Sequence, residues 1–215
     1  MEPHPEQTAS NVRIRAARRE ELAAAAELLG VAMADNPNHV AAYGGEASLR
    51  AERHAVLMRA VLGRRRGEVR LGAFHGDDVV GFVAVTPTPG CRPSPREVAC
   101  LLPSLARLGP AVLARVLAWQ RAWAGHHPTS PHLHVGPLAV HPDWRGRGLG
   151  RQLLDRVVRG QGGDETALPA YLESDRKENV GFYRAAGFAV RSEGTVLGRP
   201  NWFMDRTPES RQSGS

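Results

Sequence analysis

The sequence predicts a mixed α/β fold whose sheet combines antiparallel hairpins with one parallel strand pair. Segments with strand-like alternation and segments with helical spacing of apolar residues follow one another along most of the chain. A Gly/Asp turn at residues 75–78 joins two β-rich runs, which is typical of a hairpin. A glycine-rich loop at residues 143–148 leads from a strand into a helix and on to a further strand, and such a crossover makes the two strands parallel.

The sequence of the N-terminal half predicts a strand and two amphipathic helices, followed by the hairpin. The segment with Asn36-Pro37-Asn38 and Tyr43-Gly44-Gly45 carries turn residues at both ends and predicts a loop. In chain order the predicted elements are a strand at 12–15, a helix at 19–33, a loop at 36–45, a helix at 46–62 and hairpin strands at 69–74 and 79–85.

The middle of the chain differs from both flanks because prolines interrupt it between residues 87 and 131. Within it, residues 111–124 have strong helical periodicity through Val112, Val116 and Trp119. We therefore expect an inserted helical pair over about residues 91–127.

The second half repeats the strand and helix alternation that predicts the crossover. Its elements are a strand at 132–140, a helix at 149–159, a strand at 170–174, a helix at 179–186 and terminal strands near 190 and 201–204. Residues 1–10 and 207–215 have little to bury, so we expect disordered ends around one domain over residues 11–206.

Composition limits the classes of function. The formal net charge is +6, but the arginines are spread over many segments and do not form the basic stripe of a nucleic-acid-binding domain. No apolar run is long enough to span a bilayer, and the N-terminus lacks a signal-peptide pattern, so we expect a cytoplasmic protein without a membrane partner. Cys91 and Cys100 are too few for a disulfide framework and fit reduced thiols.

The segment 138–154 carries the chemistry, because it is a strand that turns through glycines into a helix. Free backbone N–H groups and the helix dipole make such a start an anion site, and glycines let the N–H groups converge. The loop is not a P-loop, since Arg151-Gln152 follows Gly150 where Lys-Ser/Thr is required, and Arg151 also breaks the dinucleotide fingerprint. Taken alone, the glycines could serve only the turn.

The motif Arg145-x-x-Gly148-x-Gly150 after a hydrophobic strand resembles the signature of the GNAT (Gcn5-related) N-acetyltransferase family. A second block, residues 171–174 and 179–188, is similar to the fifth strand and following helix of that family, with its Asn, Phe-Tyr and closing Gly-Phe. Residues 172–174, the helical insertion and residues 200–204 also resemble the bacterial branch that includes puromycin N-acetyltransferase.

The resemblance implies the GNAT acyl-CoA N-acyltransferase fold, with a mostly antiparallel sheet and a parallel pair splayed around the cofactor. It also implies acetyl-CoA as co-substrate and transfer to a primary amine, expected to be that of a small molecule. A protein or peptide amine, and a catalytically silent acyl-CoA sensor, stay open as alternatives. The choice between monomer and homodimer is left open too.

Residue roles follow from the same resemblance. It implies that the N–H of Leu138 faces the acetyl carbonyl, that Val140 binds pantetheine and that Asn179 hydrogen-bonds the pantetheine arm, although Asn179 could instead be a helix cap. It implies that Tyr183 protonates the leaving thiolate; a core aromatic is the alternative. The predicted cofactor-binding residues are Leu138, Ala139, Val140, Arg145, Gly146, Arg147, Gly148, Leu149, Gly150, Arg151, Asn179 and Tyr183.

The general base is either His134 or Glu173. His134 lies four residues before Leu138 on a strand, which predicts that both side chains share one face, and an imidazole titrates near neutral pH. Glu173, on the neighbouring strand, is the rival or a structural carboxylate. His132 and His134 could share a metal, but without a third ligand at a recognisable spacing we expect none, and His126-His127 fits a loop.

Overall fold

A computed structural model describes residues 11–92, 94–160 and 168–207, whose strands form one seven-stranded sheet. The strand order is β1-β2-β3-β4-β5-β7-β6, with every neighbouring pair antiparallel except the parallel β4 and β5. The strands are β1 (Val12–Ala16), β2 (Val69–His75), β3 (Asp78–Pro87), β4 (Leu133–Val140), β5 (Ala170–Ser174), β6 (Ala189–Val196) and β7 (Arg199–Arg206). The predicted mixed fold, with its single parallel pair, is confirmed.

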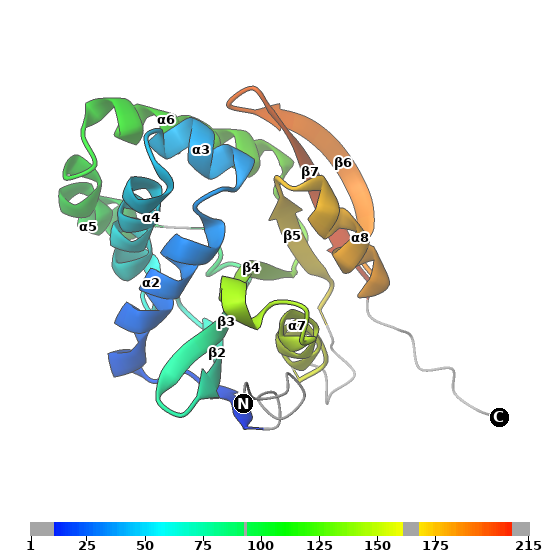
Figure 1. The fold of residues 1–215 in the computed structure, drawn as a ribbon. Helices are drawn as coiled ribbons and strands as arrows, with labels where there is room; N and C mark the ends of the chain where they lie inside the picture. The colour runs from blue at the N-terminus through cyan, green and yellow to red at the C-terminus, as the bar shows by residue number, and fades with distance from the viewer. Residues whose placement is uncertain (1–10, 93, 161–167, 208–215) are drawn as a thin grey trace.

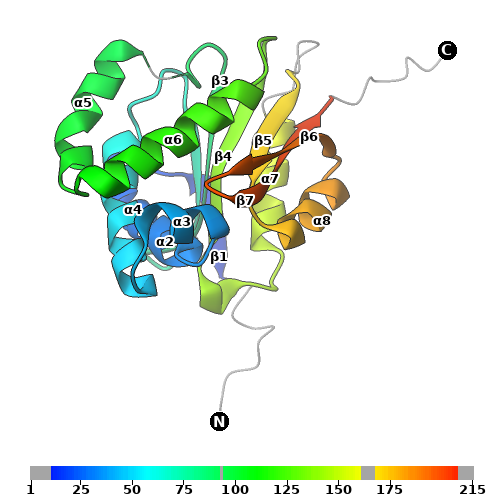
Figure 2. The same cartoon turned by 90° about the horizontal axis from the view of Figure 1, so that it is seen from above.

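Helices cover both faces of the sheet (Figures 1 and 2), with α2–α6 on one side and α7 and α8 on the other. The helical elements are η1 (Arg19–Glu21), α2 (Leu22–Met33), α3 (Pro37–Tyr43), α4 (Ala47–Val61), α5 (Pro95–Ala106), α6 (Pro110–His126), η2 (Pro142–Trp144), α7 (Leu149–Gly160) and α8 (Lys177–Ala185). The crossover from β4 through α7 to β5 matches the prediction.

Each face of the sheet has its own apolar core. On one face, Leu153 and Leu154 of α7 pack with Val83 and Val85 of β3. On the other face, α2 packs against β2 and β3, where Phe82 and the other core side chains are almost fully buried. Burial of a large apolar side chain contributes about 1.5–3 kcal/mol, so these two layers hold the sheet between its helices.

The helical insertion is confirmed as the pair α5 and α6. Ser94 caps α5 by accepting the N–H of Glu97, whose carboxylate in turn accepts the N–H of Ser94. Pro110 occupies the first turn of α6, where a missing N–H costs nothing. A third core beside the sheet forms where α6 packs against α3 and α4, burying Val112, Val116 and Trp119.

The predicted loop at residues 36–45 is wrong, because residues 37–43 form the helix α3. Asn36 takes the extended conformation of an N-cap, Pro37 follows in the first turn, and Gly44 ends the helix with a φ of 62°. The turn residues therefore mark the two ends of a short helix. Its 7 residues are too few for an apolar period to be recognised in the sequence.

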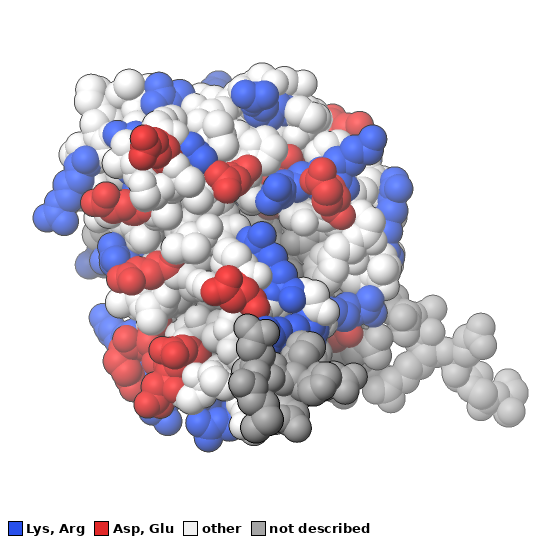
Figure 3. Space-filling view, viewed as in Figure 1, with Lys and Arg blue, Asp and Glu red and all other residues white. Residues whose placement is uncertain are grey.

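On the face of the molecule in Figure 3, positive and negative side chains intermingle, in keeping with the spread of arginines along the sequence. Among the described residues, no helix has both the length and the apolar character that crossing a membrane requires. The predictions of disorder at residues 1–10 and 208–215 lie outside the described residues.

Candidate active site

The parallel strands β4 and β5 separate soon after they meet. In the described part of the chain, their register holds only two pairs, Leu133 with Ala170 and His134 with Tyr171. Beyond His134 the strands diverge, and residues 135–140 line a cavity. A fork of this kind exposes the backbone N–H and C=O groups of both strands, which in a closed sheet would be consumed by pairing.

A bulge in β4 overturns the predicted common face of His134 and Leu138. Val85 of β3 pairs with Val135, but Val83 pairs with Leu138, so β4 holds one extra residue at Gly136-Pro137. One extra residue reverses which side chains face each side of a sheet. Leu138 consequently packs toward the α7 face, whereas His134 points to the opposite face, toward the helices α2–α6.

The backbone of β4 directs two N–H groups into the fork. His141 donates its N–H to the carbonyl of Val80 on β3 at 2.9 Å. Because successive N–H groups along a strand point to opposite edges, those of Leu138 and Val140 point away from β3 and toward the gap. Both N–H groups are therefore free to bind a ligand in the gap, and the contacts with acetyl-CoA that the resemblance implied for them stay predictions.

The glycine loop that follows has the backbone that its sequence predicts. Gly146 and Gly148 have φ values of 76° and 73°, a region that favours glycine. α7 begins directly afterwards at Leu149, so its unpaired N–H groups open toward the cavity that residues 145, 146 and 148–151 line. Gly150 packs beside Phe182 of α8, where a β-carbon added to the glycine would lie 3.7 Å from the Phe182 ring.

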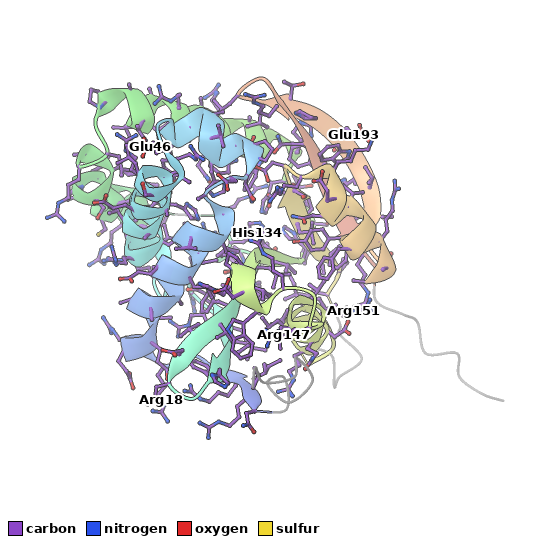
Figure 4. All side chains as sticks on the ribbon, in the orientation of Figure 1. Arg18, Glu46, His134, Arg147, Arg151 and Glu193 are labelled. Atoms are coloured by element: carbon purple, nitrogen blue, oxygen red, sulfur yellow. The ribbon has the colours of Figure 1, made fainter. Side chains whose placement is uncertain are left out.

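The arginines of the loop make hydrogen bonds and ring contacts within the protein. Arg145 donates to the carbonyl of Ala32 at the end of α2, at 2.9 Å, and Arg151 donates to Asp155 and to the carbonyl of Ala185. Arg147 folds back over the Trp144 ring and lies outside the cavity lining. Figure 4 shows Arg147 and Arg151 at the α7 end, away from His134 in the middle of the molecule. The guanidinium groups of these arginines already have partners within the protein. An anion at the loop would therefore meet mainly backbone N–H groups.

His134 and Glu173 face one another at the fork, so the two rival bases form one unit. Nε2 of His134 lies 2.8 Å from a carboxylate oxygen of Glu173, and the two side chains are only 16% and 4% exposed. Burial opposes charge on Glu173, but the nearby imidazole and its hydrogen bond hold the pKa of this carboxyl below its ordinary value. A carboxylate only accepts, so a neutral His134 donates Nε2–H and leaves Nδ1 free to take a proton.

His127 was missed by the sequence analysis, which treated His126-His127 as a loop. His126 is the last residue of α6 and stacks on Phe203, and the ring of His127 lies 5.2 Å from that of His134. Burial lowers the pKa of His127 to about 4, so this ring is neutral at physiological pH. No periodic pattern in the sequence marks a residue that reaches the site from the end of a helix.

Ligand atoms for a metal gather in two groups among the described residues. One consists of His127, His134 and Glu173 and the other of Cys91, His127 and His132, with the ligand atoms of each within 4.8 Å of one another. The pair considered in the sequence, His132 with His134, does not occur together in either group. The short hydrogen bond between His134 and Glu173 already satisfies two members of the first group.

Tyr183 and Asn179 lie on α8, where both line the cavity. Tyr183 is 9% exposed and packs against Phe182 and Phe188, and burial raises the pKa of its hydroxyl, which therefore stays protonated. Asn179 is not the cap of α8, because the helix begins at Lys177 and Arg176 occupies the N-cap position. Its side chain is thus available for another role.

One cavity of about 740 Å³ joins these parts. The glycine loop and α8 line one end, the His134–Glu173 pair lies at the fork, and α2, α4 and α6 line the other end. Asp175 also lines it, directly after β5, where it accepts the N–H of Asn38 at 2.7 Å. Its position after the carboxyl end of a parallel strand was a signal that the sequence analysis could have used.

Part of the chain is similar to known proteins. Residues 110–190 match the model of the acetyltransferase (GNAT) domain. Among solved structures, an acetyltransferase from Corynebacterium glutamicum, described as histone acetyltransferase HPA2 and related acetyltransferase, superposes with a TM-score of 0.66. The sequence identity is 19%, and the superposition covers 94% of this chain and 99% of the other, so the likeness concerns the fold.

Two curated bacterial proteins match parts of the sequence. The peptidyl-lysine N-acetyltransferase YjaB of Salmonella typhimurium is 35% identical over 72 residues, which are 31% of this chain and 45% of that protein. The L-amino acid N-acyltransferase MnaT of Escherichia coli is 31% identical over 84 residues, 37% of this chain and 46% of that protein. The matches thus span less than half of each relative.

Proposed function

We propose that this chain, whose residues 110–190 match the acetyltransferase (GNAT) domain, moves an acetyl group from acetyl-CoA to a primary amine of a small molecule. The observation that carries the proposal is the His134–Glu173 pair at the fork of β4 and β5, in the same cavity as the glycine loop. A proton acceptor and an anion site in one cavity are what direct transfer in a ternary complex requires.

The cofactor end is built from backbone groups. The N–H groups at the start of α7, with the helix dipole, suit the pyrophosphate of acetyl-CoA. The free edge of β4 at Leu138 and Val140 suits the amide groups of the pantetheine arm, and Asn179 offers a side-chain amide from α8. The thioester would then lie beside the fork, next to His134.

The His134–Glu173 pair supplies the base. An incoming ammonium group gives its proton to Nδ1 of His134, and the carboxylate of Glu173 stabilises the imidazolium that forms. The free amine then attacks the thioester carbonyl, forming the C–N bond. In this reading Glu173 is a positioning residue that acts through His134.

Two further groups complete the transfer. The N–H of Leu138, aimed into the gap, stabilises the oxyanion of the tetrahedral intermediate. When the C–S bond breaks, the hydroxyl of Tyr183 gives its proton to the departing thiolate, and its raised pKa keeps that proton in place beforehand. The attacking nitrogen releases its remaining extra proton as the amide forms, and a proton from solvent restores the Tyr183 hydroxyl. The products are the N-acetylated amine and the free thiol of CoA.

The acceptor class separates this proposal from its alternatives. A protein or peptide amine and a silent acyl-CoA sensor would share the glycine loop, but the sensor would have no use for the His134–Glu173 pair or for Tyr183. Residues 172–174, the insertion α5–α6 and residues 200–204 support membership of the branch that includes puromycin N-acetyltransferase, as part of the same proposal.

The test is a panel of aminonucleosides, aminoglycosides, polyamines, amino acids and peptides, scored by thiol release from acetyl-CoA. We expect release that depends on at least one small amine. Acetyl-CoA at about a hundredfold excess over its Kd should also stabilise the fold by roughly 2.7 kcal/mol. Cofactor binding without transfer to any amine would favour the sensor, and absence of both would refute the proposal.

A further inference from the structure

The end of the cavity beyond His134 is lined mainly by apolar side chains from helices. They belong to α2, α4 and α6 and are Met33, Met58, Val61, Val116, Trp119 and Trp123. Met58, Val61 and Trp123 are only partly buried, so apolar surface remains uncovered inside the cavity. Covering such surface with an apolar ligand is favourable by roughly 25 cal/mol per Å².

Three polar side chains in this wall, His39, Tyr43 and His54, are neutral. His39 and His54 are buried, with their Nε2 atoms 3.4 Å apart, and Nδ1 of His54 is 3.1 Å from the hydroxyl of Tyr43. Burial holds the pKa of His39 well below its ordinary value and lowers that of His54 to about 3. The three side chains therefore line the cavity as uncharged, mutually hydrogen-bonded groups.

Every carboxylate that lines the cavity among the described residues already has a partner. Glu173 pairs with His134, and Asp175 accepts the N–H of Asn38. At the edges, Glu68 accepts the N–H of Gly63, and Glu178 lies 3.9 Å from the guanidinium of Arg176. The described residues that line the cavity from α2, α4 and α6 include no carboxylate, so a second ammonium group placed against this wall would lack a counter-ion there, which is costly.

Beside Trp123, which lines the cavity, hydrogen bonds join α3, α6 and β7. Asn38 and Asn201 are both fully buried and exchange two side-chain hydrogen bonds of 2.8 and 3.2 Å, and Trp123 donates its indole N–H to Asn201 at 2.9 Å. Arg115 of α6 also donates to the carbonyl of Ala42 in α3. The polar main chain of a peptide would leave the apolar wall uncovered, whereas a compact apolar body covers it.

We infer that the acceptor is a small primary amine with a single positive charge on a compact apolar body, aromatic or aliphatic, and not a polyamine, an aminoglycoside or a lysine in a peptide. The inference deepens the proposed function and rests on it. The amine end lies at His134 and the body lies against α2, α4 and α6.

The test compares acceptors that differ in one feature. Hexylamine and 1,6-diaminohexane have the same length, but only the second carries a distal ammonium; 2-phenylethylamine and an acetyl-capped lysine peptide complete the set. We expect kcat/KM for hexylamine and 2-phenylethylamine to exceed that for the diamine and the peptide by at least about tenfold. Equal or higher values for the diamine or the peptide would overturn the inference.

A charge placed in the apolar wall should reverse the preference. Met58→Glu adds a carboxylate without a partner, and Met58→Gln is the matched variant of similar size without charge. We expect Met58→Glu to raise the diamine-to-hexylamine ratio of kcat/KM at least about tenfold over that of Met58→Gln. An unchanged ratio in two folded variants that still bind acetyl-CoA would contradict the assignment of this wall to the acceptor.

Amine binding is measured separately, by quenching of Trp119 and Trp123 fluorescence in the presence of CoA. If no amine in the set is acetylated, the proposed function fails, but the binding preference still reports on the acceptor class. Tighter binding of hexylamine than of 1,6-diaminohexane supports the inference, and the reverse order refutes it.

Discussion

The two ends of the cavity are built by different means. At the cofactor end, a continuous stretch from β4 through the glycine loop to α7 offers backbone N–H groups, and Gly146 and Gly148 hold the conformation that exposes them. At the acceptor end, side chains from α2, α4 and α6 meet, although α2 and α6 lie almost eighty residues apart in the sequence.

The difference predicts that the two ends of the cavity respond differently to substitutions. A backbone site tolerates many side chains so long as its glycines stay, because the atoms that bind belong to every residue. A site made of side chains changes with each substitution in its walls. His134 and Glu173 stand at the boundary of the two ends, where the strands part.

The largest effect on turnover is expected for Tyr183→Phe, which removes one hydroxyl and keeps the aromatic packing against Phe182 and Phe188. Loss of a general acid lowers kcat by about 10² to 10⁴, while KM for acetyl-CoA should change by no more than a few-fold. Steady-state kinetics with a verified acceptor measure both values. Wild-type turnover in the folded variant would remove Tyr183 from the mechanism.

Gly148→Val tests whether the cofactor end depends on backbone conformation. The φ of 73° at Gly148 is one that a β-branched residue avoids, so the loop must rearrange and its N–H groups no longer converge. We expect acetyl-CoA affinity to fall by at least about a hundredfold, measured by calorimetry. Arg147→Ala, whose side chain lies outside the cavity, should cost only a few-fold.

A general defect of glycine replacement is controlled by Gly125→Val in α6, where an added side chain meets nothing within 4 Å. This variant should bind acetyl-CoA like the wild type. Unchanged affinity in a folded Gly148→Val protein would show that the loop does not hold the pyrophosphate.

His134→Ala tests the base. Turnover should fall most near neutral pH, by about 10² or more, and recover partly at high pH, where the amine is deprotonated without help. Glu173→Gln should give a smaller loss with the same trend, because it acts through His134. The measurement is kcat against pH; a constant ratio of variant to wild type across the range would argue against both residues as the proton-accepting unit.

The smallest expected effect is on the pH dependence of stability, and it comes from His39 and His54 at the acceptor end. Above the ordinary histidine pKa of 6.5, His39 and His54 are neutral in the folded and the unfolded chain alike. Below it, the unfolded chain binds protons that the folded chain excludes, so the free energy of unfolding falls as pH falls, by up to about 1.4 kcal/mol per pH unit for each histidine.

Urea unfolding at pH 7, 6 and 5 measures this slope. His54→Gln should flatten it, whereas His141→Gln, at a partly exposed histidine near the glycine loop, should not. An equal slope in all three proteins would mean that other groups govern the acid sensitivity.

The sequence predicted the strand, glycine loop and helix of residues 138–154 well because their signals are local. Glycine spacing, the strand before the loop and the helix after it all lie within residues 138–154, and the backbone has the expected form. The face of His134 could not be predicted in this way, since the bulge at Gly136-Pro137 is defined only by pairing with β3. The pairing of His134 with Glu173 likewise depends on the register of two strands.

The acceptor end could not be predicted from short-range patterns in the sequence. α3 is too short to show a period, and Asn38 meets Asn201 across a separation of 163 residues. The hydrophobic pattern of residues 111–124 correctly placed Trp119 in a helix, but a pattern gives no information about which cavity a helix covers.

The Asn38–Asn201 pair also ties the selectivity of the cavity to the order in which the chain is made. During synthesis the ribosome releases α2, α3 and α4 long before β7, so Asn38 is made well before the amide of Asn201 with which it pairs. Only when residue 201 has emerged and β7 has paired with β5 does the wall with Trp123 close. The position of Trp123 in the cavity wall therefore depends on a residue that is added near the end of synthesis.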